Sequence, residues 1–383
     1  MSEPIRVLQV LGHLNLGGAE SRVMDMYRAM NRDHVQFDFC IHKKEECFFE
    51  KEIKEMGGRV YRIPRFKVYN YFAYKKAWSN FFKEHKEFAA IHGHMTSTAA
   101  IYLPVAKKAG VPLTIAHARS AGVDHSVKGI ITKIIRRPLK NRTDFCFTCS
   151  GLAGQAVYGN EACKSGRVHI IPNAINASKY LFNKEIRGQL RSQLGIEENL
   201  VIGHVGTFRY AKNHMFLLEV FAEILKLNSN ARLLIVGDGE LRSAIENKIR
   251  ELGISNEVIL AGLRSNVADY MNAMDLLLFP SFYEGLPGTV VEAQASGLPC
   301  LISTNITSEV GLSDIVRFKS LEDQASNWAD EALSMVAQKR ETRLSEVQKA
   351  GFDIELQVPM MEEFYKTGVI PEGLEYFDKG KNE

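Results

Sequence analysis

The chain has 383 residues, which at roughly 150 residues per domain predicts two or three domains. Hydrophobic residues make up 45% and charged residues 24%, which is ordinary for a soluble globular protein. The net charge of +3 is too close to balance to indicate a nucleic-acid partner, so none is expected. No signal peptide and no run of ~18 apolar residues is visible. We therefore expect a cytoplasmic protein and leave open a peripheral position on the inner face of the cell membrane.

Short β-rich runs alternate with helical patterns in two successive series. Strand–helix alternation of this kind predicts an α/β fold with two parallel sheets covered by helices. We place the boundary near residue 180, with a strandless, charged end after residue 352. The expected strands are 5–11, 35–41, 59–63, 89–93, 113–118, 145–149 and 168–172 in the first series, and 200–206, 232–237, 257–262, 275–280 and 299–303 in the second.

Two such domains facing each other make a cleft, and parallel sheets bind ligands outside the carboxyl ends of their strands. The loop "LGHLNLGGAES" (11–21) follows the first strand. Gly17 and Gly18 would let backbone N–H groups approach a phosphate at the start of a helix near Ala19. The spacing is not G-x-G-x-x-G, so a plain tight turn is an equal alternative.

The loop "VGTFRYAKNH" (205–214) follows the first strand of the second series. It carries Arg209 and Lys212 close to the start of the next helix. Cations oppose the helix dipole there, which favours an anion bound between them and the helix. A solvated charged loop is the alternative.

The stretch "YEGLPGTVVE" (283–292) places Glu284 in a loop and Glu292 inside the following helix. Pro287 suits the first helical turn, and the helix is expected to end near residue 296. Glu292 then lies roughly 7–8 Å along the axis, which suits a clamp on an elongated ligand. An acid–base pair would need both carboxylates at one reacting centre. The alternative is a chance pair of surface glutamates.

Metal binding is not expected. No D-x-D pattern occurs in the chain, although magnesium sites commonly use carboxylates. His92 and His94 share one face of a strand end, but the sequence places no third ligand beside them. His117, at the end of "LTIAH", is expected to point into the cleft, or else to be a satisfied strand-end histidine.

Residues 128–142, "KGIITKIIRRPLKNR", predict an amphipathic helix that ends near Arg137 because of Pro138. Such a helix could lie on an anionic membrane surface or pack on its own domain. The isoleucines at 130, 131, 134 and 135 are expected on one side, and Lys133, Arg136, Arg137 and Lys140 on the other.

The segment "PSFYEGLPGTVVEAQASGLPCLIS" (280–303) resembles the signature of family 4 glycosyltransferases, which have the GT-B fold of two Rossmann-like domains facing a cleft. The closest resemblance is to bacterial exopolysaccharide and capsule enzymes. It covers nearly the whole chain and includes the glycines 17–18, "IHGHM", "IAHAR", "IPNAIN", "VGTFRYAKNH", "VGDGEL" and "VILAGLRSNVADYMNAMD".

The resemblance implies an acceptor-side domain over 1–180 and a nucleotide-sugar domain over 181–352. Residues 353–383 would form a helical segment that crosses back to the first domain. It also implies retaining transfer of a sugar from a nucleotide sugar, UDP by resemblance only, to a lipid-linked or polysaccharide acceptor. No cofactor is expected, because the nucleotide sugar is a substrate.

By matching position, Glu284 would hold the sugar hydroxyls and Glu292 the ribose. Lys212 would meet the diphosphate, and His117 would contact the sugar near the reacting carbon. The catalytic assignments are therefore His117 and Glu284. The donor-binding assignments are Gly17, Gly18, Arg209, Lys212, Gly285, Leu286, Pro287 and Glu292.

Two departures weaken the parallel. Thr207 stands where the family often has arginine, so Arg209 would have to reach the phosphates from two residues on. Ala174 and Asn176 replace common Gly and Asp near the expected hinge, which leaves the donor open. Two other functions stay open at this point: a GT-B-like nucleotide-sugar epimerase and a non-catalytic sugar-nucleotide-binding subunit.

Overall fold

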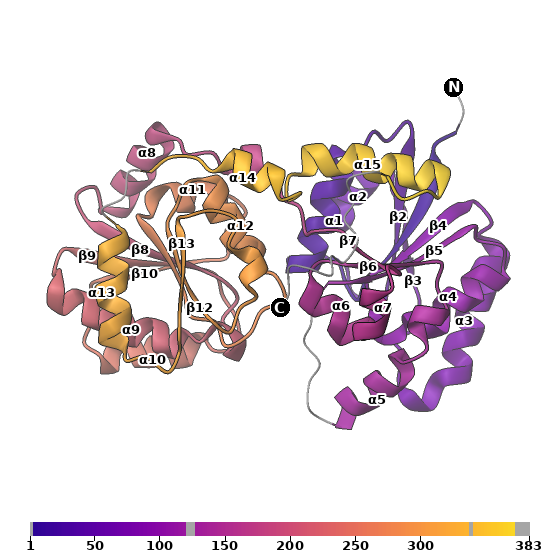
Figure 1. Ribbon diagram of the computed structural model, residues 1–383, viewed down its shortest axis with the longest axis horizontal. Helices are drawn as coiled ribbons and strands as arrows, with labels where there is room; N and C mark the ends of the chain where they lie inside the picture. The colour runs from indigo at the N-terminus through magenta and orange to yellow at the C-terminus, as the bar shows by residue number, and fades with distance from the viewer. Residues whose placement is uncertain (1–2, 120–126, 337–339, 372–383) are drawn as a thin grey trace. The chain divides into compact units, whose positions relative to one another are not determined.

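The computed structural model describes residues 3–119, 127–336 and 340–371 (Figure 1). The chain divides into two compact units, each built on one parallel sheet. The first unit contains the chain up to Ala174 and returns from Ile354 onward, and the second is Ile175–Asp353. Each unit is an open α/β sheet with helices on both faces, as the strand–helix alternation predicts.

The sheet of the first unit has seven parallel strands in the order β3-β2-β1-β4-β5-β6-β7. Its strand order reverses beside β1, because the chain builds outward to β3 and then returns to add β4 on the other side. The strands are β1 Ile5–Val10, β2 Val35–Ile41, β3 Val60–Arg62, β4 Phe88–Gly93, β5 Leu113–Ala118, β6 Phe145–Thr148 and β7 Val168–Ile170.

Helices bury an apolar stripe against each face of this sheet. Trp78 and Tyr102 pack with Leu8 on one face, and Phe364 of the last helix packs with Phe37 on the other. Alternate residues of each strand thus reach opposite cores. The helices are α1 Gly18–Ala29, α2 Glu50–Glu55, α3 Tyr71–Glu84, α4 Thr96–Lys108, α5 Val127–Arg136, α6 Gly151–Tyr158, α7 Asn160–Lys164 and α15 Ile354–Thr367.

The sheet of the second unit has six parallel strands in the order β10-β9-β8-β11-β12-β13, so its order reverses beside β8. The strands are β8 Leu200–Val205, β9 Ala231–Val236, β10 Val258–Gly262, β11 Leu276–Phe279, β12 Cys300–Ser303 and β13 Val316–Lys319. The helices are α8 Lys184–Leu194, α9 His214–Leu227, α10 Arg242–Glu251, α11 Val267–Ala273, α12 Gly288–Ala295, α13 Ala325–Met335 and α14 Leu344–Lys349.

The sequence missed β13. Its residues "VRFK" form the edge strand beside β12 and are only partly buried or exposed. An edge strand with one covered neighbour lacks the continuous apolar run that marks a central parallel strand. The other twelve strands match the expected segments to within two residues at each end.

Helix α5 is correctly placed, but its faces differ from the expectation. Arg136 is buried and donates from Nη2 to the carbonyl oxygen of Ala156 at 2.7 Å, so it is not part of a solvated basic face. The isoleucines also divide: Ile130 and Ile134 are exposed, whereas Ile135 packs against the core of the unit. Ile130 and Ile134 lie four residues apart and so share one face of the helix, whereas the hydrogen bond to Ala156 of α6 places Arg136 on the buried side.

Two glycines just past helix ends provide a matched test of this packing. Gly297 follows α12 with φ +67° and Gly253 follows α10 with φ +69°, so both need the left-handed region. A Cβ at Gly253 would meet nothing within 4 Å, whereas a Cβ at Gly297 would overlap the carbonyl of Glu341.

We expect Gly253→Ala to lower the free energy of unfolding by about 1–2 kcal/mol through backbone strain alone. Gly297→Ala should cost about 1–3 kcal/mol more, because the backbone of residue 341 has to move as well. Urea denaturation of both variants checks this. Equal losses would show that the second unit accommodates the added methyl group without strain.

Candidate active site

The second unit presents its expected site residues at the point where the strand order reverses. The loop after β8 carries Lys212, and the loop after β11 carries Glu284. Strands β8 and β11 are parallel neighbours, with Leu276 opposite Ile202. Both loops therefore leave the same edge of the sheet side by side, where open α/β sheets bind ligands.

These two loops are joined by several contacts. Lys212 Nζ lies 2.6 Å from Glu284 Oε1, and both side chains are largely shielded from solvent. The amide of Phe282 donates to the carbonyl of Ala211 at 2.8 Å, and the rings of Tyr210 and Phe282 stack at 4.7 Å between centroids. The sequence predicted both charges at this edge but did not predict that they contact each other.

The Lys212 side chain also contacts the aromatic ring of Phe279. Its Nζ lies 4.5 Å from the centroid of the Phe279 ring at the end of β11. A Cβ at Gly206 would lie 3.1 Å from Lys212 Cε, so any other residue at position 206 would crowd the lysine side chain. A lysine fixed in this way keeps its ammonium at one place on the ligand edge, which suits recognition of a phosphate group.

Helix α12 starts at Gly288, with Pro287 in extended conformation at its N-cap position. No side chain caps this end, so N–H groups of the first turn stay available at the positive pole of the helix. Glu292 is 5% exposed and Leu286 is 7% exposed in the core of the unit. Burial of Glu292 excludes the alternative of a chance pair of surface glutamates.

Arg209 is less well placed than Lys212. It is exposed at the start of the short 3-10 helix η4, Tyr210–Lys212, and no contact fixes its guanidinium among the described residues. Thr207, which stands at the family's arginine position, is exposed too. Asn213, which ends η4 and starts α9, has φ +52°, a left-handed conformation that asparagine tolerates better than most residues. An asparagine is the only feature of the sequence that indicates this turn.

In the first unit, α1 starts at Gly18 after Gly17, close to the expected position. A carboxylate already lies there: a Cβ at Gly17 would overlap the side chain of Glu20, whose Oε1 is 3.5 Å from His13 Nδ1. Nothing lies within 4 Å of a Cβ at Gly18. The space at Gly18 therefore allows a close approach to the backbone, whereas Gly17 is covered by its own helix.

The sequence did not place a third ligand beside His92 and His94, but the structure brings His117 to them in the first unit. His92, His94 and His117 bring one ring nitrogen each within 4.8 Å of one another. His117 was expected to point into the cleft, but its side chain is fully buried against His92 and Phe147. His117 is buried because β4 and β5 are adjacent, so the side chains at the ends of these two strands pack against each other.

Hydrogen bonds occupy this cluster. His92 Nδ1 lies 2.7 Å from the Tyr365 hydroxyl, and His92 Nε2 lies 3.0 Å from His117 Nδ1. His94 Nε2 lies 2.8 Å from Gln9 Oε1, and Arg119 donates from Nε to His94 Nδ1 at 3.2 Å. Both nitrogens of His92 and of His94 are thus engaged, and the guanidinium of Arg119 places a positive charge at the cluster, which disfavours a second cation.

The direction of these hydrogen bonds follows from the tyrosine. Burial raises the pKa of Tyr365 well above its usual value, so the hydroxyl stays protonated, and we assign it as the donor to His92 Nδ1. His92 must then donate from Nε2 to His117 Nδ1, which leaves the His117 proton on Nε2. His117 Nε2 has no hydrogen-bond partner among the described residues. This assignment makes His117 a donor, not a base.

Comparisons with known proteins identify the family of this chain. Residues 16–179 match the family described as Glycosyltransferase Family 4, and residues 186–314 match Glycosyl transferases group 1. EpsF of Bacillus subtilis, itself assigned as a glycosyltransferase, is 33% identical over 94% of this chain and 96% of its own length. The chain belongs to the family 4 glycosyltransferases. This confirms the resemblance inferred from the signature at 280–303.

Two further relatives indicate the setting of this glycosyltransferase. The capsular polysaccharide biosynthesis glycosyltransferase CapH of Staphylococcus aureus is 24% identical over 95% of this chain and 99% of its own. A Campylobacter jejuni α-1,4-N-acetylgalactosaminyltransferase, whose name specifies an undecaprenol-diphosphate-linked acceptor, is 28% identical over 82% of each chain. The glycosyltransferase is thus related to enzymes of bacterial polysaccharide biosynthesis.

Solved structures share its fold. The crystal structure of HepE from Anabaena in complex with UDP and glucose matches 95% of this chain and 100% of that one, with a TM-score of 0.77 at 17% identity. This confirms the GT-B fold predicted from the sequence. In the described parts of the glycosyltransferase, no helix combines the length and apolar character needed to span a membrane.

Burial of the histidine cluster makes the first unit acid-sensitive. Burial lowers the pKa of His92, His94 and His117 well below the usual value, with Arg119 acting in the same direction. Below about pH 6.5 the unfolded chain binds protons that the folded chain excludes. The free energy of unfolding therefore decreases as the pH is lowered.

We expect the melting temperature to decline from pH 7 to pH 5.5, before carboxylates titrate. His94→Gln should reduce the slope of the free energy of unfolding against pH by up to about 1.4 kcal/mol per pH unit. A melting temperature that stays constant over this range would show that the rings are already charged in the folded protein.

The tautomer of His117 provides a sharper test. In ¹⁵N NMR spectra at neutral pH we expect a neutral His117 ring with its proton on Nε2. Tyr365→Phe removes the donor that fixes His92, so the two tautomers of His117 should become mixed. The exposed Tyr69 makes a control, because Tyr69→Phe should leave the spectrum unchanged. A proton on Nδ1 of His117 in the unaltered protein would reverse the assigned direction.

Proposed function

We propose that this glycosyltransferase transfers a hexose with retention from a UDP-sugar to a lipid-linked or polysaccharide acceptor in surface polysaccharide synthesis. The carrying observation is the Lys212–Glu284 pair at the strand-order reversal of the second unit, 2.6 Å apart beside the free start of α12. Support for UDP comes from HepE, whose structure contains UDP and glucose. Support for a lipid-linked acceptor comes from the named acceptor of the Campylobacter relative.

In this proposal the donor replaces the ion pair with contacts of its own. Lys212 and the first-turn N–H groups of α12 would bind the diphosphate, and Glu284 would accept hydrogen bonds from sugar hydroxyls. Glu292 would hold the ribose, and the backbone of Gly285, Leu286 and Pro287 would line the donor. Gly18 and Arg209 are assigned to the same diphosphate, Arg209 less securely because it is exposed and unsupported.

The reaction then needs no nucleophile from the protein. The bond between the sugar's anomeric carbon and the diphosphate oxygen breaks, and a bond to the acceptor oxygen forms on the same face. The acceptor's proton passes to the leaving diphosphate. Lys212 and the helix start would stabilise the negative charge that develops on that diphosphate. With these partners the transfer is proposed to proceed without a metal cofactor.

His117 would act in this scheme as a hydrogen-bond donor. Its proton lies on Nε2 in the network assigned above, so a neutral ring can donate to a sugar hydroxyl but cannot take the acceptor's proton. Because the ring is fully buried, contact with the sugar requires the covering residues to move.

Sugar transfer from a panel of UDP-, GDP- and ADP-sugars to a lipid-linked acceptor tests the proposal. Glu284→Gln should lower kcat/KM at least ~100-fold, and Lys212→Met should raise the donor KM at least ~10-fold. The exposed pair Lys226–Glu223 in the same unit is the matched control, so Lys226→Met should leave both constants unchanged.

The outcomes separate the alternatives. Full activity of Glu284→Gln would overturn the site assignment. If Lys212 and Glu284 only stabilise each other, the double variant will lose stability but bind UDP as tightly as the unaltered enzyme. Epimerisation of a UDP-sugar without acceptor would indicate an epimerase, and UDP-sugar binding without turnover on any acceptor would indicate a non-catalytic subunit.

A further inference from the structure

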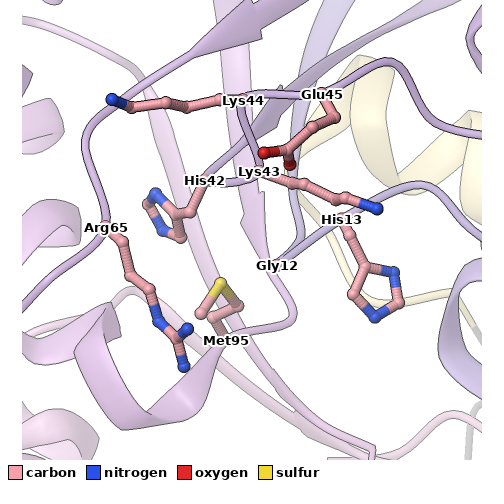
Figure 2. A pocket seen from close by; sticks show the side chains of 8 residues that line it. All are labelled: Gly12, His13, His42, Lys43, Lys44, Glu45, Arg65 and Met95. Carbon is pink, nitrogen blue, oxygen red and sulfur yellow. The ribbon is translucent and has the colours of Figure 1, made fainter.

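A cationic pocket lies at the carboxyl ends of strands β1 to β4 in the first unit. Four loops that follow these strands line it: Gly12 and His13 after β1, residues 42–45 after β2, Arg65 after β3 and Met95 after β4. Figure 2 shows the side chains of Lys43 and His13 on one side and the guanidinium of Arg65 on the other. The cavity of about 500 Å³ is of the size that small-molecule sites have.

Positive charge is in excess around this cationic pocket. Lys43, Lys44 and Arg65 form no ion pair among the described residues, and Glu45 is the single carboxylate in the lining. Neighbouring Arg62, in contrast, is paired with Glu50 at 2.6 Å. Lys43, Lys44 and Arg65 all line the same cavity, and a bound anion would offset the repulsion among their charges.

His42 completes the base of the pocket without adding charge. Its Nδ1 lies 3.0 Å from the carbonyl oxygen of Ile63, and its Nε2 lies 3.3 Å from the Tyr74 hydroxyl. Burial lowers the pKa of His42, which keeps the ring neutral at pH 7. The attraction for an anion therefore comes from the lysines and the arginine.

A second cavity of about 700 Å³ adjoins the first and has a different character. It shares His42, Arg65 and Met95 with the cationic pocket. Its further lining is apolar at Phe66 and Val68, beside η1 (Val68–Asn70), and at Ile131 and Ile135 on α5. Lys67, Ser97, Thr98 and Thr132 complete it. The exposed apolar side chains nearest in sequence to this lining are Val68, Tyr69, Phe72, Ile130 and Ile134, from 55% to 84% exposed.

We propose that the two cavities together bind a polyprenyl-diphosphate-linked acceptor, with the diphosphate in the cationic pocket and the first isoprenoid units in the apolar cavity. This rests on the proposed function, which includes a lipid-linked acceptor. The pairing of an unneutralised cationic cavity with an apolar one matches the two halves of such a molecule. A nucleotide-sugar donor has no group that would fill the apolar half.

Binding to the full chain can be measured by titration calorimetry with farnesyl diphosphate, inorganic diphosphate and UDP as probes. Lys43→Gln combined with Arg65→Gln should weaken farnesyl diphosphate at least ~10-fold, because two charge-assisted contacts are lost. Ile135→Ala should weaken farnesyl diphosphate but leave inorganic diphosphate unchanged. UDP binding should be unaffected by all these changes, since its proposed partners are Gly18, which lines neither cavity, and residues of the second unit.

The matched control is Lys54→Gln combined with Lys108→Gln, which removes the same charge from exposed positions of the first unit outside both cavities. This variant should bind every probe as the unaltered chain does. Unchanged farnesyl diphosphate binding by the Lys43/Arg65 variant would overturn the proposal, and equal loss of UDP would reassign the pocket to the donor.

Two further outcomes separate this proposal from its neighbours. If the Lys43/Arg65 variant loses affinity for phosphatidylglycerol vesicles but not for farnesyl diphosphate, the cations serve a membrane surface and the proposal is wrong. If UDP fails to bind the unaltered chain while farnesyl diphosphate binds through Lys43 and Arg65, the proposed donor site fails and the acceptor pocket stands.

Discussion

The reversal of strand order beside the first strand of each sheet is the constraint on which both sites depend. In a parallel sheet all strands end at one edge, and the helices that follow neighbouring strands normally close the space between their loops. Where the order reverses, at β1/β4 and at β8/β11, the following helices lie on opposite faces. The loops there can hold a ligand, and they carry the functional candidates of both units.

The two ligand-binding edges differ in whether their cations are paired with a carboxylate. At β8/β11 the cation of Lys212 contacts a carboxylate within the unit, so a diphosphate must compete with Glu284 for it. At β1–β4 the cations of Lys43 and Arg65 form no ion pair within the described parts of the chain. A paired lysine discriminates, because only a ligand that also satisfies the released carboxylate binds without loss. A sugar diphosphate offers both groups, whereas a lipid diphosphate offers only the anion, which matches the unpaired edge.

Sequence patterns predicted what depends on neighbours along the chain. Buried parallel strands are continuous apolar runs, so twelve of them were predictable, and the glycine and proline around α12 marked its ends. Contacts between distant segments were not predictable. The ion pair of Lys212 joins two loops, the burial of Arg136 depends on α6, and the third ring of the histidine cluster comes from the neighbouring strand. The cationic pocket gathers residues from four loops, so no motif announces it.

The hydrogen-bonded histidines show what such distant contacts can control. Tyr365 lies 273 positions from His92, yet its hydroxyl determines which nitrogen of His117 carries the proton. The residue comes from α15, which returns to the first unit after the chain has built the second. A segment that looked in sequence like a strandless end thus supplies the donor that sets the chemistry of a buried ring. In the assigned direction the proton of His117 depends on donation by Tyr365, which links the packing of α15 to the chemistry of a buried ring on β5.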